Sequence, residues 1–169
     1  ISVGSGKNSI TDIEDSASAD LTETSKIAIT GSGQLTLGEV VLKDASEIDA
    51  SAATGKMLIT VDATVDKVTT GSANDTITLT VGDFGNTVVA KTIDGGAGDD
   101  TVVVAADLAA SDLVAKVGSH SITAEILDAD VATAVGSGAD VTRAVDVAGI
   151  TGLTKVTSTV TSLDNTCLL

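Results

Sequence analysis

Short turns rich in glycine and serine recur along the chain, and each runs into a stretch of β-branched and aliphatic residues. Such turns begin at Gly4, Gly31, Gly71, Gly95 and Gly136. Their spacing is irregular, which a solenoid of stacked coils tolerates, because extra residues in one coil become surface loops. A repeated turn-and-strand unit therefore predicts an elongated body built from coils.

The stretches between the turns read as β-strands. Residues 76–81 alternate threonine with Ile77, Leu79 and Val81, so the aliphatic side chains would face inward and the threonines outward. Residues 101–104 form a short apolar run, which is typical of a buried parallel strand. Both patterns indicate a β-rich chain.

The apolar residues are almost all small and aliphatic. The chain has no Pro, Trp or Tyr and a single Phe, Phe84, although 43% of its residues are hydrophobic. A core without rings must stack aliphatic side chains in thin layers, which suits a solenoid. We expect an all-β fold, a parallel β-helix or β-roll-like solenoid, with a β-sandwich as the alternative.

Two stretches have the apolar spacing of short helices. Residues 106–117 and 124–135 are rich in alanine, place aliphatic residues near one face, and are each followed by glycine. These stretches predict one or two short helical insertions. We expect a single β-rich domain, or a segment of a larger surface protein, with a repeat-like body at 1–104, a helical insertion at 105–136 and a β continuation at 137–169.

The chain is strongly acidic, with 24 Asp and Glu against 9 Lys and Arg and a net charge of −15. Nucleic acids and anionic lipids bind to basic surfaces, so neither is an expected partner. No apolar run reaches the length of a membrane span, and no membrane insertion is expected. Such a charge attracts divalent cations. The alternative is that the charge only keeps the protein soluble, through repulsion between molecules.

The sequence offers no catalytic constellation. His120 is the only histidine and Cys167 the only cysteine, and neither lies in a pattern typical of a catalytic pair. No phosphate-binding loop or zinc-ligand spacing occurs. We therefore expect a protein that is not an enzyme.

One motif carries recognisable chemistry. Residues 95–103 fit the nonapeptide G-G-x-G-x-D-x-U-x at every fixed position. Its glycines let the loop adopt positive φ, Asp100 supplies an anionic oxygen, and Val102 anchors the following strand in the core. Calcium takes six to eight oxygen ligands, so carbonyls and carboxylates suit it. The motif predicts a calcium site.

A single loop leaves that calcium shell incomplete, so a second loop should stack on it. Residues 70–78 keep Gly71, Asp75 and Ile77 at the matching positions, and a coil of about 25 residues would bring Asp75 and Asp100 into register. Gly, Asn and Asp also favour plain turns, and that reading is preferred for the degenerate copies. The candidate metal ligands are Asp100, Asp75, Asp99, Asp94, Gly96, Gly98, Asn74, Asn8 and Asp140.

Residues 48–104 resemble a known superfamily. The phrase Ile48-Asp49-Ala50-Ser51, followed by residues 70–77 and the nonapeptide, is similar to the repeats-in-toxin calcium-binding superfamily and, within it, to S-layer proteins of Gram-negative bacteria. The resemblance implies type I secretion, folding on extracellular calcium, and assembly into a lattice at the bacterial cell surface.

These features together predict a structural component of a secreted bacterial surface layer or filament, folded and assembled with calcium. The alternative is a calcium-binding stalk or accessory domain of an adhesin or a secreted hydrolase. Neither end of the repeat region carries a recognisable polar cap, so self-association into a lattice or filament is expected. Surface polysaccharide is a further candidate partner.

Overall fold

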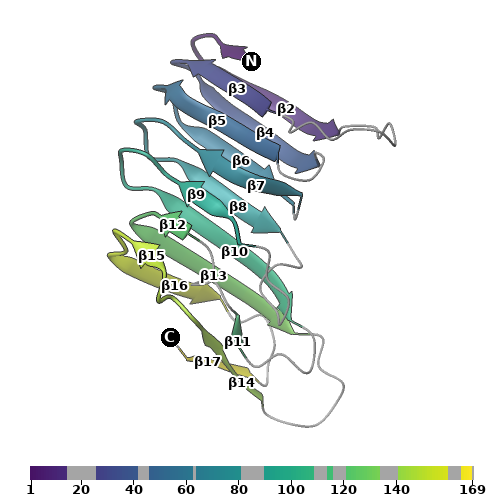
Figure 1. Cartoon of the computed structure of the whole chain (residues 1–169), viewed down its shortest axis with the longest axis vertical. Coiled ribbons are helices and arrows are strands. Elements are labelled where there is room, and N and C mark those ends of the chain that lie inside the picture. Colours follow the sequence, from purple (N-terminus) through teal and green to yellow (C-terminus); the bar gives the residue numbers. More distant parts are fainter. Residues whose placement is uncertain are drawn as a thin grey trace.

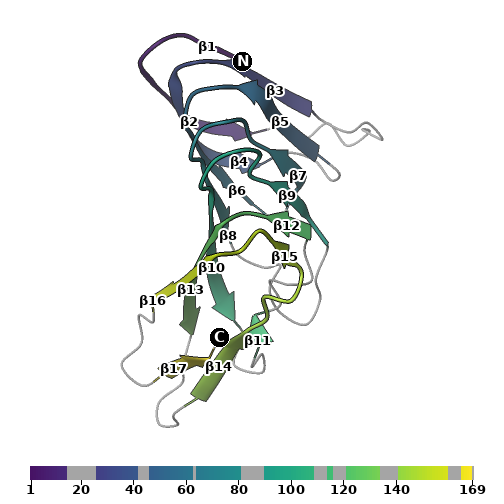
Figure 2. The ribbon, with the colours of Figure 1, turned by 90° about the vertical axis from the view of Figure 1, so that its left-hand side faces the viewer.

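The chain folds into a β-solenoid made of two parallel sheets (Figure 1). The computed structural model describes residues 1–14, 26–41, 46–62, 64–80, 90–108, 114–115, 121–133, 141–159 and 165–168. The prediction of an all-β solenoid is confirmed, and the two facing layers are visible in side view (Figure 2).

Sheets A and B contain seven strands each, and each strand of sheet A is followed along the chain by a strand of sheet B. Sheet A consists of β1 (Ser2–Val3), β3 (Lys26–Gly31), β5 (Ser46–Ala53), β7 (Val65–Thr69), β9 (Thr92–Asp94), β12 (Ser121–Thr123) and β15 (Ile150–Thr151). Sheet B consists of β2 (Lys7–Glu14), β4 (Gln34–Val41), β6 (Met57–Val61), β8 (Thr76–Thr80), β10 (Thr101–Leu108), β13 (Ile126–Thr133) and β16 (Lys155–Thr159).

The length of a coil varies along the solenoid. Contacts between equivalent positions join residues 20 apart at Glu47 and Lys67, and 25 apart at Thr70 and Gly95. Nearer the C-terminus the separation grows to 29 residues. This variation explains the irregular spacing of the glycine turns in the sequence.

Aliphatic side chains fill the space between the two sheets. Along sheet A, Ile48, Val68, Ile93 and Ile122 pair in register, and each is at most 1% exposed. Sheet B contributes every second residue of its strands, including Met57, Ile59, Ile77, Leu79, Val102 and Val104, all at most 2% exposed. The predicted alternation is confirmed over residues 76–80, while Val81 lies outside the described residues. Each fully buried side chain stabilises the fold by about 1.5–3 kcal/mol.

The predicted helices are wrong wherever the structure describes them. Residues 126–133 form β13, which pairs in parallel with β10 and β16, and residues 106–108 complete β10. Leu127 and Ala129 are both buried, as alternate residues of a strand facing one core. Pairing with strands on both sides outweighs the weak helix preference of an alanine-rich sequence.

A third sheet takes up part of the additional length of the last coils. It joins β11 (Val114–Ala115), β14 (Val141–Val145) and β17 (Asn165–Leu168) in parallel. The predicted β continuation at 137–169 thus contains strands β14 to β17, and Asp140 lies outside the described residues. Among the described residues there is no helix of the length and hydropathy that crossing a bilayer requires.

Candidate metal site

The turns that lead into sheet B stack directly on one another. The 70–75 turn and the 95–100 turn are in register, because Thr76 pairs with Thr101 in the strands that follow them. Backbone hydrogen bonds join the two turns, from Ala97 N to Gly71 O at 2.9 Å and from Thr101 N to Asp75 O at 2.9 Å. The predicted coil of about 25 residues is confirmed here.

The glycines of the nonapeptide have both a conformational and a packing role. Gly96 and Gly98 have φ angles of 82° and 143°, a region that residues with a Cβ rarely adopt. A Cβ at Gly96 would also overlap the carbonyl oxygen of Gly71, and one at Gly71 would overlap that of Ala53. Close stacking of the coils therefore explains why glycine occupies these positions, and this explanation does not involve a metal.

Asp75 lies inside the stack, 1% exposed, with both carboxylate oxygens occupied. Its Oδ1 accepts a hydrogen bond from Met57 N of the preceding coil at 2.7 Å, and its Oδ2 accepts one from Gly71 N of its own turn at 3.1 Å. Burial raises the pKa of Asp75, although these hydrogen bonds oppose the shift. The side chain thus fastens one coil to the next.

Asp100 repeats this arrangement only in part. Its Oδ1 accepts a hydrogen bond from Asp75 N at 2.8 Å, but its buried Oδ2 has no hydrogen-bond partner among the described residues. Burial raises the pKa of Asp100 to about 6, the amide of Asp75 opposes that shift, and the charges of Asp75, Glu125 and Asp99 add to it. A buried oxygen without a partner is costly, so this carboxylate is suited to an additional donor or cation.

The two turns differ in the acceptor of the amide of the glycine at their second position. In the 95–100 turn, Gly96 N donates to Asp94 Oδ1 at 3.0 Å, whereas the equivalent Gly71 N donates to Asp75. Thr69 occupies the position of Asp94 one coil earlier. Asp94 therefore holds the amide that the geometry of the preceding turn would assign to Asp100.

Glu125 extends the stack by one more coil. Its Oε2 accepts a hydrogen bond from Asp100 N at 2.9 Å, across a separation of 25 residues. Asp75, Asp100 and Glu125 thus form a line of acidic side chains across successive coils, which we call the carboxylate ladder. Sequence reasoning missed Glu125 because residues 124–135 were interpreted as a helix. Its 25-residue distance from Asp100 was the available signal.

The remaining candidates lie on the outer side of the turns. Asn74 and Asp99 are exposed, and Asp99 N donates to Asn74 Oδ1 at 3.2 Å. Asp94 is half-buried. The outer surface of the two turns therefore presents carboxylate and amide oxygens beside the buried Asp100.

Asn8 occupies the equivalent position near the N-terminus but presents a donor. Its Nδ2 donates to the carbonyl oxygens of Gly4, Gly6 and Gln34 at 3.3, 3.4 and 3.2 Å. An amide nitrogen thus fills the point where three carbonyl oxygens converge. In this geometry Asn8 closes its turn without an ion.

The atoms that could bind a metal at the 95–100 turn suit a hard cation, because all of them are oxygens. Within the described ranges, however, no group of three or more His, Cys, Asp or Glu side chains is already arranged to hold a metal. Calcium binding at this turn would therefore require the half-buried carboxylate of Asp94 and the exposed carboxylate of Asp99 to close around the ion.

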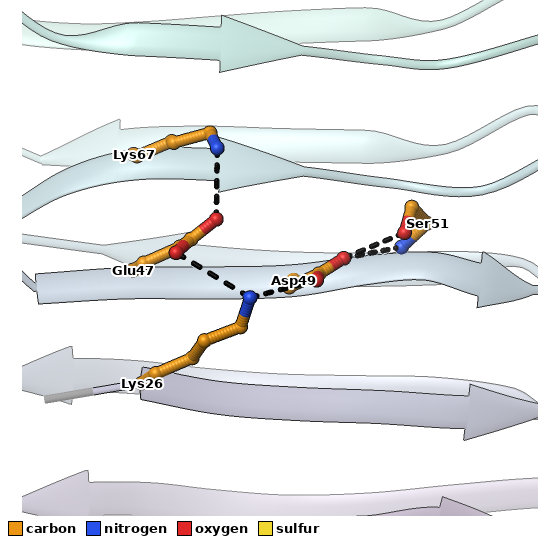
Figure 3. Close-up of polar contacts among 5 residues, drawn as sticks. All are labelled: Lys26, Glu47, Asp49, Ser51 and Lys67. Atoms are coloured by element: carbon orange, nitrogen blue, oxygen red, sulfur yellow. Dashed lines mark hydrogen bonds and ion pairs between the residues drawn. The ribbon is translucent and has the colours of Figure 1, made fainter.

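A second cluster of charges crosses the outer face of sheet A (Figure 3). Lys26 contacts Asp49 at 3.0 Å and Glu47 at 3.5 Å, and Lys67 contacts Glu47 at 2.8 Å. The Ser51 hydroxyl and Lys26 lower the pKa of Asp49, and Lys67 lowers that of Glu47. These exposed pairs link strands β3, β5 and β7, and they have the features of a structural network.

Comparison of the chain with protein-family models, with curated proteins and with solved structures gave no match.

Proposed function

We propose that this chain is a structural component of a secreted bacterial surface layer or filament, folded and assembled with calcium. The observation that carries the proposal is the buried, unpartnered Oδ2 of Asp100 within a complete nonapeptide. The register between the 70–75 and 95–100 turns supports it, because calcium sites of this kind need stacked loops. The proposed location is the extracellular side of the cell surface.

Calcium has two roles in this proposal. Within the chain, an ion at the outer side of the 95–100 turn would draw on Asp94, Asp99 and Asn74 and reduce repulsion along the carboxylate ladder. Between chains, divalent ions would offset the net charge of −15. A site of about 10⁻⁴ M affinity in millimolar calcium would contribute about 1.4 kcal/mol of stability.

The architecture is compatible with self-association. Among the described strands, the outermost are β1 and β15 in sheet A and β2 and β16 in sheet B, and no described strand pairs with their outer edges. Such edges pair readily with strands of another molecule. Repeated pairing would produce a filament, and lateral contacts would extend it into a layer.

The calcium site is tested by calorimetry on the intact chain and on two double variants of equal charge. Asp94→Asn with Asp99→Asn should abolish the strongest binding phase and the calcium-dependent rise in Tm. Asp12→Asn with Asp66→Asn removes the same charge away from the turn and should leave both intact. Equal losses in the two variants would indicate diffuse attraction of counterions and contradict the site.

Assembly is tested separately by titrating calcium and following particle size by light scattering and electron microscopy. Ordered filaments or sheets are expected above the calcium concentration that saturates folding, and magnesium should replace calcium poorly because it prefers a smaller octahedral shell. A protein that remains monomeric at high concentration in saturating calcium would instead support the stalk or accessory domain of an adhesin or a secreted hydrolase.

A further inference from the structure

We infer that Asp94 couples cation binding to the formation of one more hydrogen bond in the carboxylate ladder, and we call position 94 the latch position. Without a cation, Asp94 holds the backbone amide of Gly96. When Asp94 turns to a cation at the outer side of the turn, that amide passes to the unpartnered Oδ2 of Asp100. This inference rests on the proposed calcium binding and assigns its regulation within the chain.

The equivalent turn of the preceding coil, at 70–75, already has the hydrogen bond that we propose for the cation-bound state. There the Gly71 amide donates to Asp75 Oδ2 at 3.1 Å, and Asp75 has a partner on both oxygens. Thr69 occupies the latch position and makes no carboxylate available to Gly71. The two turns are in register, and the residue at the latch position is a carboxylate in one turn and a hydroxyl in the other.

In the 95–100 turn the unpartnered oxygen of Asp100 lies beside the start of the turn. Asp100 is 1% exposed, and a Cβ built on Gly95 would lie 2.6 Å from its Oδ2, so this oxygen lies against the start of its own turn. Gly96 is the next residue along the chain, and its φ of 82° differs from that of Gly71, which lies outside the positive-φ region, so the transfer includes a local rotation of the backbone at Gly96. The amide needs to change its acceptor, and the coils can stay in register.

The charges around Asp100 favour a link to a cation. Asp75 lies on one side of it in the carboxylate ladder, Glu125 on the other, and Asp99 is adjacent in the chain. Each adds negative charge near the unpartnered oxygen. A cation on the outer side of the turn weakens this repulsion at the same moment that it frees the Gly96 amide.

The test follows the Gly96 amide by ¹⁵N–¹H NMR and hydrogen exchange in the intact chain. Adding calcium to the wild type should shift the Gly96 resonance and slow its exchange at least tenfold. Asp94→Thr copies the residue of the preceding coil, and its Gly96 amide should match the calcium-bound wild type with chelator present. Asp99→Asn retains Asp94 at the latch position and should match the metal-free wild type under chelator.

A further variant identifies the acceptor. Asp100→Asn places an amide group at the acceptor side chain, so calcium should no longer slow Gly96 exchange as in the wild type. Calcium binding that leaves the Gly96 amide unchanged would overturn the coupling through Asp94 while the proposed function stands. A wild-type chain that binds no calcium would overturn both.

Discussion

The backbone amide of Asp75 donates to Oδ1 of Asp100 at 2.8 Å, across a separation of 25 residues. The amide of Met57 likewise donates to Asp75, across 18 residues, and the amide of Asp100 donates to Glu125, across 25. Each carboxylate thus accepts a backbone amide of the preceding coil. The carboxylate ladder therefore has a direction, and each of its members fixes the register of two coils.

Removing the Asp100 acceptor should destabilise the metal-free chain. Asp100→Ala leaves the buried amide of Asp75 without a partner, and we expect a loss of about 1–3 kcal/mol. Asp100→Asn keeps a carbonyl oxygen and removes a buried charge, so its stability should equal or exceed that of the wild type. Urea unfolding in chelator measures both variants, and an equal loss in the two would contradict the role of this hydrogen bond.

Lowering the pH from 7 to 5 should stabilise the metal-free chain. The pKa of Asp100 is raised to about 6, whereas a solvated Asp titrates near 4. The folded state therefore keeps its proton over a range where the unfolded chain has lost it. This contribution is complete below about pH 4 and is lost as the pH rises through about 6.

Over that range we expect the free energy of unfolding to be about 1 kcal/mol higher at pH 5 than at pH 7. Asp49, whose pKa is lowered, titrates below this window and should not cancel the effect. Urea unfolding at the two pH values measures the difference. Burial also raises the pKa of Asp75, which therefore contributes with the same sign. Asp100→Asn should remove the part that is due to Asp100, and a variant with the full wild-type difference would show that Asp100 is not responsible.

Gly71→Ala should be strongly destabilising, because its Cβ would overlap the carbonyl oxygen of Ala53 in the preceding coil. Displacing stacked backbone is expected to cost about 1–3 kcal/mol or more. Gly4→Ala is the matched control, since a Cβ at Gly4 meets nothing within 4 Å. Thermal unfolding compares the two, and similar Tm values would mean that the coils are not packed this closely.

The ion pairs on sheet A should matter little. Glu47→Gln breaks contacts with Lys26 and Lys67, but all three side chains are at least partly exposed to solvent. Exposed pairs contribute about 0–1 kcal/mol, and salt screens them. We expect a small loss of stability at low ionic strength that disappears in 1 M NaCl. A large loss that persists in salt would contradict this assignment.

The fold was predictable because its signals are local. Alternation at Ile77 and Leu79 requires only that strands have a period of two, and a turn at Gly95 and Gly96 requires only that glycine tolerates positive φ. Residues 126–133 were misjudged because alanine and aspartate weaken the strand signal. Pairing with β10 and β16, which decides their structure, is not visible in a short window.

The candidate site was predictable in outline. The register of Asp75 with Asp100 follows from their spacing, but the direction of each carboxylate depends on which amides the neighbouring coils leave free. The competition between Asp94 and Asp100 for the Gly96 amide is such a case. The nonapeptide pattern starts after Asp94, so it does not predict that Asp94 accepts the Gly96 amide while Asp100 keeps an oxygen without a partner.

The stacking of the coils also determines how the chain would respond to force. Hydrogen bonds between parallel strands lie along the direction in which the strands are stacked, which is the long axis of the body (Figure 1). Tension along that axis acts on successive coil interfaces in series, so the weakest interface opens first and the others remain closed. Tension across the axis is shared by many coils at once. A body built this way extends stepwise in one direction and is stiff in the other.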